Sequence, residues 1–252
     1  MPLTEPVYIV SVVRDYEMYD RCVRNNPFCQ GFQLFPLDNR TENLPVPVRY
    51  NQFLDREEED GWIVFCHEDW RLDCCLPPLL EGLDRSRLYG PIGMWLIECP
   101  HSDFMEVRGF TVDGPKDGSR SNRFRGVRLR GRVDTFDCQC LVVHSSLIRR
   151  YGLRFDERLA FDLYVEDFCV GAYERYGIES HILLMECHHF SQGSIGQRFY
   201  EALACLQEKY RSARKRYASI VGRHITFGRN TDKPVYNMHR TLGAMIRYLI
   251  KK

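Results

Sequence analysis

Apolar runs alternate with amphipathic stretches along the first hundred residues. Residues 7–13 form a run rich in β-branched apolar residues, as in a strand buried on both faces, and residues 31–37, 61–66 and 88–93 are further strand candidates. Residues 15–25 and 49–59 carry apolar side chains at helical spacing, and residues 76–83 are another helix candidate. This order predicts βαβ units and a mostly parallel central sheet flanked by helices, the α/β class.

The second half of the chain is less regular. Residues 111–132 are polar and carry six arginines, which favours a solvated excursion over a mobile loop that closes on an anionic ligand. A strand is expected over 136–143, helices over 145–151 and 168–176, a short strand over 182–185, and a long basic helix over 199–222. We expect one domain over residues 1–200, with halves 1–100 and 101–200, and a basic helical extension over 201–252.

The distribution of charge supports a separate role for the last segment. The 252 residues have a formal net charge of +1, but residues 207–252 contain 12 Lys/Arg and two acidic side chains. That segment therefore carries +10 and the preceding residues carry −9. A basic amphipathic segment, including residues 242–252, predicts contact with an anionic membrane surface, or alternatively a helix packed on the domain with its charges solvated.

Composition sets the expected cellular setting. No apolar run approaches the roughly 20 residues of a membrane span, and the first residues lack a signal-peptide pattern. We therefore expect a cytoplasmic protein, with a position at the inner face of the membrane as the alternative. The 11 cysteines are odd in number and irregularly spaced, which favours buried, reduced thiols. A zinc site from Cys138, Cys140, Cys187 and His188 remains an alternative, although its spacing fits zinc motifs poorly.

Acidic and imidazole side chains gather just after predicted strands or at a helix start. Ligands of α/β sheets collect at the carboxyl ends of the strands, where carboxylates can hold a divalent cation or act as a general base. Turn or helix capping is the alternative role of each acidic group. The candidates are Asp38, His67, Glu68, Asp69, Glu166, Asp167, His188 and His189.

The order of these groups resembles the GT-A (Rossmann-like) nucleotide-sugar glycosyltransferases, in particular family 2-like enzymes. The first strand, Ile9-Val10-Ser11-Val12-Val13, is of the family type, and Asp38, followed by Asn39, matches its base-contacting acid. Asn51 matches an asparagine on the next helix. His67-Glu68-Asp69 matches the metal-binding motif, with a histidine in place of the usual first aspartate. Residues 152–157, followed by Glu166-Asp167, resemble the acceptor-side segment.

The resemblance implies a function and a set of roles. It implies an inverting, metal-dependent transfer of a sugar from a nucleoside-diphosphate sugar, such as a UDP- or dTDP-sugar, to a hydroxyl of a glycan or lipid-linked acceptor. Asp167 would be the general base, with Glu166 beside it. The other roles implied are Mn²⁺ or Mg²⁺ binding by His67, Asp69 and His189, and nucleotide-sugar binding by Ser11, Val13, Asp38, Asn39, Asn51, Glu68 and Asp69.

Two other functions stay open from the sequence. A catalytically inactive GT-A-like module that only binds sugars or partners would also explain the histidine at position 67. A nucleic-acid-binding protein would use the basic tail and its tyrosines. The acidic body and the lack of a nucleic-acid-binding signature argue against the latter, so no nucleic acid is expected.

Overall fold

The computed structural model describes residues 5–56, 59–115, 122–191, 195–221, 225–229 and 234–238. The elements of the first half are β1 (Val7–Val13), α1 (Tyr16–Tyr19), η1 (Asp20–Arg24), η2 (Pro27–Cys29), β2 (Gln33–Asp38), α2 (Val46–Leu54), β3 (Trp62–Cys66), β4 (Trp70–Leu72), α3 (Pro77–Leu80), β5 (Leu88–Gly90), β6 (Ile92–Ile97), β7 (Asp103–Asp113) and β8 (Arg123–Val127). Those of the second half are β9 (Arg132–Val133), β10 (Thr135–Phe136), β11 (Cys140–His144), α4 (Ser145–Tyr151), α5 (Tyr164–Tyr176), β12 (Ser180–Ile182), β13 (Cys187–His189), α6 (Gln197–Lys209), β14 (Arg216–Ala218), β15 (Thr226–Gly228) and β16 (Val235–Asn237).

The first large sheet has the strand order β2-β1-β3-β11-β5-β12-β9. Strand β1 runs parallel to both β2 and β3, so the three strands end at the same edge of the sheet. Strand β11 is antiparallel to β3 and starts at that edge, with Cys140 beside Cys66. The α/β class predicted from the sequence is confirmed. Within this sheet, the described strands run parallel only in β2-β1-β3 and in the β5-β12 pair, because β11 enters in the opposite direction.

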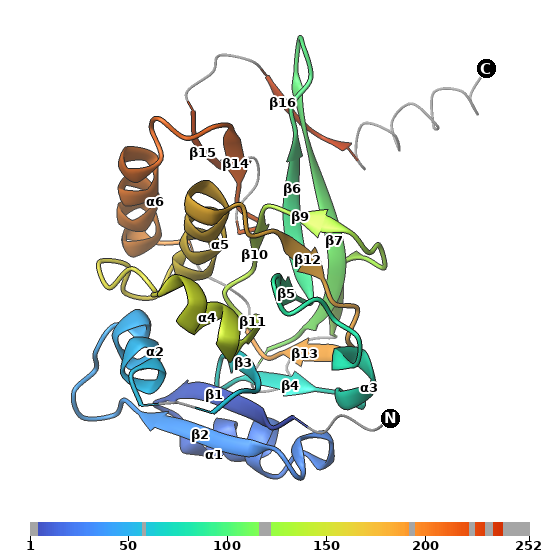
Figure 1. Ribbon diagram of the computed structural model, residues 1–252, viewed down its shortest axis with the longest axis vertical. Helices are drawn as coiled ribbons and strands as arrows, with labels where there is room; N and C mark the ends of the chain where they lie inside the picture. The colour runs from blue at the N-terminus through green and yellow to red at the C-terminus, as the bar shows by residue number, and fades with distance from the viewer. Residues whose placement is uncertain are drawn as a thin grey trace.

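The second sheet has the order β10-β6-β7-β13-β4, and β8 and β16 also pair with β7. In Figure 1 its long strands β6 and β7 lie on one side of the molecule, and α4, α5 and α6 lie on the other. Gly109 in β7 has a φ of +74°, and a Cβ at this position would lie 2.0 Å from the carbonyl oxygen of Pro91. Glycine is therefore required where β7 passes the bend between β5 and β6.

Strand β1 separates two apolar clusters. Tyr8 and Val10 belong to the larger cluster, which contains α2, α4, α5 and α6, whereas Ile9 and Val13 belong to the cluster against α1, β4 and α3. Successive side chains of a strand point to opposite faces of the sheet. A strand with apolar residues on both faces must therefore be covered on both faces. The buried strand predicted over 7–13 is confirmed in this respect.

Two helices begin earlier in the chain than predicted. Helix α2 begins at Val46 rather than Arg49, because Pro45 and Pro47 open it instead of forming a loop. Helix α5 begins at Tyr164 rather than Phe168, so the acidic pair lies in its first turn.

The long basic helix predicted over 199–222 ends at Lys209. The chain then forms the antiparallel pair β14-β15 and, later, β16, so the helical interpretation of 201–252 is wrong for these segments. The amphipathic stretch 242–252 lies outside the described residues, as do residues 116–121 of the arginine-rich stretch. Arg123 and Arg125 of that stretch belong to β8, which pairs with β7. Among the helices of the described segments, none has the length and apolar character needed to cross a membrane.

Candidate metal centre

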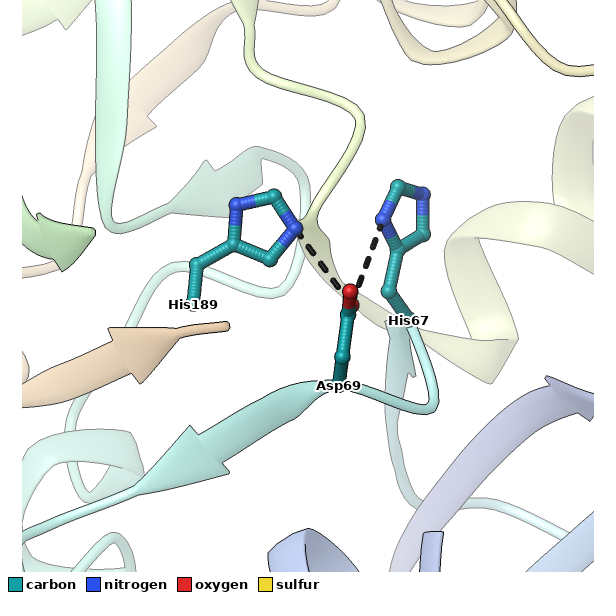
Figure 2. Close-up of side chains that lie close together, drawn as sticks. All are labelled: His67, Asp69 and His189. Atoms are coloured by element: carbon teal, nitrogen blue, oxygen red, sulfur yellow. Dashed lines mark ion pairs between the residues drawn. The ribbon is translucent and has the colours of Figure 1, made fainter. Parts of the chain in front are cut away.

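Two imidazoles and one carboxylate meet at the carboxyl edge of the parallel strands. His67, Asp69 and His189 each offer one ligand atom, and these atoms lie within 4.8 Å of one another. Asp69 Oδ1 lies 3.9 Å from Nδ1 of His67 and 3.4 Å from Nε2 of His189. Figure 2 shows the carboxylate between the two rings, which turn a nitrogen toward it.

The positions of these residues follow from backbone pairing. The turn after β3 is fixed by a hydrogen bond from the His67 N–H to the carbonyl of Gln139, at 3.1 Å. It continues into β4, whose first residue, Trp70, pairs with His189 on β13. The N–H of Phe190 donates to the carbonyl of Asp69 at 2.9 Å. Residues more than 100 positions apart in the chain are thereby held at one place.

The adjacent histidines of β13 face different surroundings. His189 joins the group around Asp69, whereas His188 stacks on Phe190 with ring centroids 4.0 Å apart. Side chains alternate along a strand, so only one of two neighbours can face the centre. Within the described ranges, this is the one cluster of three or more His, Cys, Asp or Glu residues close enough to hold an ion. The alternative zinc site of Cys138, Cys140, Cys187 and His188 is therefore not assembled.

The two imidazoles differ in their electrostatic environment. Burial lowers the pKa of His67 to about 4, so its ring is neutral at pH 7. Burial also acts on His189, but the carboxylate of Asp69, followed by those of Asp137 and Asp113, outweighs it and raises the pKa of His189 above its ordinary value. The surrounding carboxylates thus favour positive charge at this end of the centre.

A buried guanidinium organises the carboxylates behind His189. Arg125 Nε lies 2.9 Å from Asp113, and its terminal nitrogen hydrogen-bonds Asp137. Oδ1 of Asp113 in turn lies 3.8 Å from Nδ1 of His189. Arg125 belongs to the arginine-rich stretch, for which the sequence favoured solvation. Here the pairing of β8 with β7 places the side chain half-buried, with its guanidinium against Asp113 and Asp137.

The sequence missed the residues that surround His67. Phe161 stacks on its ring, with centroids 5.2 Å apart and planes at 26°, and the Tyr164 hydroxyl lies 3.1 Å from its Nε2. Both come from the segment that precedes and opens α5. Nothing in the local pattern marks them, because their contact with His67 spans almost 100 residues.

The side chain of Asp38 lies at the last position of β2, at the same edge of the sheet. Its exposed carboxylate pairs with Arg40 at 2.6 Å, and hydrogen bonds from Arg40 lower its pKa to about 2. Asn39 is buried, accepts from the Leu44 N–H and donates to the Leu44 carbonyl, both at 2.8 Å. Asp38 is thus open to a ligand, whereas the Asn39 amide shapes the loop beside it.

The other residues predicted to bind the nucleotide sugar have structural partners. Ser11 and Val13 are fully buried in β1, and the Ser11 hydroxyl lies 3.3 Å from the Cys66 sulfur. Glu68 accepts hydrogen bonds from the N–H groups of Arg14 and Asp15, at 2.6 and 2.9 Å, and so connects the end of β1 to the metal-centre turn. Asn51 exchanges two hydrogen bonds of 3.0 Å with the Phe155 backbone, which joins α2 to the segment before α5.

The predicted catalytic pair lies inside the molecule. Glu166 is fully buried and accepts hydrogen bonds from Ser219 at 2.8 Å and Cys138 at 3.1 Å. Asp167 is 3% exposed and is held by Lys209, 2.7 Å away, and by the Tyr210 hydroxyl at 2.8 Å. The side-chain contacts of Asp167 therefore run to α6 and the residue that follows it, and those of Glu166 run to Cys138 and Ser219, not to the three residues of the metal centre.

The donor set and spacing at the centre fit a divalent ion. Ligand atoms about 2.1 Å from an octahedral ion are roughly 3 Å apart when adjacent and about 4 Å apart when opposite. The separations found here, 3.4 and 3.9 Å from Asp69 to the two imidazoles and at most 4.8 Å overall, are somewhat longer, so the ligands would close in on a bound ion. Nε2 of His189 is buried and has no hydrogen-bond partner in the described part of the chain. A cation would satisfy it.

Comparison with known proteins relates the chain to others through structure alone. Neither a scan of protein-family models nor a search of curated proteins gives a match. The fold is similar to a crystal structure of GalNAc-T7 with UDP, GalNAc and Mn²⁺, with a TM-score of 0.53 and 7% sequence identity. The match covers 82% of this chain and 49% of that protein, so this chain spans about half of its length.

A second solved structure, A197 from STIV, aligns with a TM-score of 0.40 and 14% identity, over 75% of this chain and 87% of that one. We draw nothing from this weaker likeness. The similarity to GalNAc-T7, a GT-A glycosyltransferase, confirms the GT-A-like fold predicted from the order of motifs. It does not single out family 2.

Proposed function

We propose that this protein is a metal-dependent glycosyltransferase that uses a nucleoside-diphosphate sugar. The observation that carries the proposal is the position of His67, Asp69 and His189 at the carboxyl edge of the parallel strands in a GT-A-like fold. Ligand sites of open α/β sheets lie at this edge. The neighbouring fold was solved with UDP and Mn²⁺, which supports the same ligand classes here.

Mn²⁺ is the ion that we propose for the centre. Two imidazoles and one carboxylate suit a transition ion better than Mg²⁺, which prefers oxygen ligands. When bound, the ion would act as a Lewis acid that stabilises the diphosphate leaving group. The same ligand set also occurs in nonhaem Fe(II) sites, so Fe²⁺ belongs in any metal test.

The donor would lie between the metal centre and β2. His67, Asp69 and His189 would hold the ion that contacts the diphosphate, and the exposed carboxylate of Asp38 would contact the base or ribose. Glu68 would act indirectly, by fixing the turn that carries Asp69. The acceptor that we propose is a hydroxyl of a glycan or of a lipid-linked sugar, and the donor is a UDP- or dTDP-sugar.

A catalytically inactive sugar-binding module is the second candidate, and the surroundings of Asp167 favour it. Both oxygens of that carboxylate are engaged by Lys209 and Tyr210. To remove a proton from an acceptor, Asp167 would have to give up these partners. Its assignment as general base rests on the resemblance alone, and it stays a prediction, as does inversion at the anomeric carbon.

Asp69→Asn tests the metal centre. In the wild type, Mn²⁺ with UDP should raise the melting temperature, because a ligand at 100 times its Kd adds about 2.7 kcal/mol of stability. Asp69→Asn should abolish this effect. Asp73→Asn, at the other end of β4, is the matched control and should retain it. Equal stabilisation of wild type and Asp69→Asn would contradict the assignment.

Release of UDP separates the two candidate functions. A transferase should liberate UDP from one sugar of a UDP- and dTDP-sugar panel in a Mn²⁺-dependent manner, and faster when its acceptor is added. A binding module should show metal-dependent stabilisation by the same nucleotide without any release. Fe²⁺-dependent stabilisation without a nucleotide effect would contradict both.

A further inference from the structure

The hydroxyl of Tyr164 lies between two polar partners in the interior. Tyr164 is 1% exposed, and its ring packs against Tyr50 and Phe155. The hydroxyl oxygen is 3.0 Å from the carbonyl oxygen of Cys138 and 3.1 Å from Nε2 of His67. A phenolic hydroxyl has one hydrogen to donate and can also accept, so the two contacts must have opposite directions.

The direction of each bond follows from the chemistry of the partners. The Cys138 carbonyl oxygen only accepts, and the Tyr50 hydroxyl, whose own hydrogen goes to the Cys66 carbonyl at 3.2 Å, also faces Tyr164 as an acceptor. The Tyr164 hydrogen therefore points to one of these two oxygens. In either case the oxygen of Tyr164 is left as an acceptor, and Nε2 of His67 must be the donor. Because a neutral imidazole carries a single ring hydrogen, Nδ1 of His67 is left with its lone pair exposed toward Asp69, 3.9 Å away.

The opposite tautomer would disturb the contacts on both sides of the His67 ring. With its hydrogen on Nδ1, His67 could approach Tyr164 only as an acceptor, and the Cys138 carbonyl would lose its hydrogen bond. An N–H would also point toward Asp69, where an ion needs a lone pair. Phe161, stacked on the imidazole, restrains the ring against the flip that would exchange its two nitrogens.

The second imidazole has a comparable arrangement with its nitrogens reversed. Nε2 of His189 faces Asp69, and Nδ1 lies 3.8 Å from the Asp113 carboxylate. Each ring therefore has Asp69 near one nitrogen and another acceptor near its other nitrogen. Outer partners of this kind commonly set the tautomer and orientation of metal-binding histidines.

We propose that Tyr164 is a positioning residue that holds His67 in the Nε2–H tautomer and so directs the Nδ1 lone pair to the cation. The role of Tyr164 in metal binding depends on the proposed metal centre, because the lone pair of His67 Nδ1 would bind that ion. The tautomer itself is a property of the metal-free protein.

Long-range ¹H–¹⁵N NMR of the metal-free protein tests the inference directly. The two tautomers give distinct patterns of nitrogen shifts and couplings, and the His67 signals can be assigned by their loss in His67→Gln. We expect the Nε2–H pattern in the wild type. An Nδ1–H pattern would overturn the proposal whether or not the protein binds metal.

Tyr164→Phe measures the consequence for metal binding. We expect Mn²⁺ affinity, followed by electron paramagnetic resonance of the free ion, to fall about 10- to 100-fold, and the Nε2–H pattern to be lost. Tyr89→Phe is the matched control, because it removes another tyrosine–carbonyl bond, of 3.0 Å to Asp84, away from His67. Its affinity should equal that of the wild type.

The outcomes separate the two proposals. Unchanged Mn²⁺ affinity and an unchanged tautomer in Tyr164→Phe would overturn the positioning role. Absence of Mn²⁺ binding by the wild type would overturn the metal centre, while the NMR pattern would still decide what Tyr164 does. If Tyr164→Phe does not fold, the wild-type spectrum alone gives the answer.

Discussion

The Glu166 carboxyl is enclosed by protein on every side, and this sets its protonation. Burial raises its pKa to about 7, although Cys138 and Ser219 both donate hydrogen bonds to it. An isolated buried carboxylate is costly, so the group holds its proton to a higher pH than it would in water. Its neighbour Asp167 is also buried, but it has Lys209 as a counter-ion. Two adjacent acids thus have different charge environments.

Glu166→Gln should change how stability depends on pH. The folded-state pKa is about 7 and the ordinary value is 4.5, so the native state binds more protons between these values. The stabilising contribution is complete below pH 4.5 and is lost as the pH rises through 7, about 3 kcal/mol in all. Urea unfolding at a series of pH values should show this decline in the wild type and its absence in Glu166→Gln.

The exposed Glu208 provides the control. Glu208→Gln removes a surface carboxylate that pairs with Arg211 and should change the free energy of unfolding by at most about 1 kcal/mol. If Glu166→Gln and the wild type have parallel profiles between pH 4.5 and 7, the buried carboxyl is ionised throughout and the argument fails.

At the scale of elements, α5 and α6 are joined by charge as well as by apolar packing. Lys209, the last residue of α6, lies 2.8 Å from Asp156 and 2.7 Å from Asp167 in the first turn of α5. The first residue after α6, Tyr210, donates to the same Asp167 carboxylate. The end of one helix is thereby fixed to the start of the other.

Lys209→Met should destabilise the fold strongly. Removing one member of a buried ion pair leaves an uncompensated charge, which costs about 3–5 kcal/mol. Arg211→Met, two residues away, breaks a surface pair with Glu208 and should cost at most about 1 kcal/mol. Chemical denaturation of the two variants should differ accordingly, and equal stabilities would show that the Lys209 pair contributes nothing.

The sequence identifies what is local and misses what depends on distant partners. The apolar run of β1 and the helix stop at Gly152, which has a φ of +58°, follow from residues next to them. The order of the acidic and imidazole residues can also be read from the sequence. The sequence does not show that His189, rather than His188, faces the metal centre, because this depends on which face of β13 meets β4 and β7. The end of α6 is set by β15, which pairs with β14.

At the scale of the whole molecule, the charge separation along the chain disappears in space. Among the described residues after position 207, Lys209 and four further basic side chains pair with acids of the preceding body. Arg214 contacts Glu174 at 3.9 Å, Lys215 contacts Asp134 at 2.6 Å, and the pairs Arg216–Asp103 and Arg229–Glu98 add to these. The basic side chains of 209–229 that form these pairs therefore serve first as counter-ions of the protein itself.

A chain ending at residue 207 should fail to fold cooperatively. It lacks Tyr210, Tyr217 and Phe227, which are buried in the larger apolar cluster. Loss of one such aromatic side chain costs about 3–5 kcal/mol, so the loss of all three matches or exceeds the usual free energy of unfolding of a domain. Near-ultraviolet circular dichroism should show no fixed aromatic packing.

A chain ending at residue 238 is the comparison. It retains each ion pair named above, and a cooperative transition is expected. Native-like unfolding of the chain ending at 207 would contradict the role given to the segment. The longer chain also tests the proposed membrane contact, since loss of binding to anionic vesicles in this chain would assign that contact to residues 239–252.

The pairing of the last segment with the body has a consequence for biosynthesis. A ribosome releases the chain from its N-terminus, so the acidic body emerges before the cations that neutralise it. The strands of the parallel edge can form early, but the Asp167 and Asp134 carboxylates meet Lys209 and Lys215 only when residues 209–215 have left the ribosome. We therefore expect nascent chains stalled near residue 200 to remain sensitive to proteases.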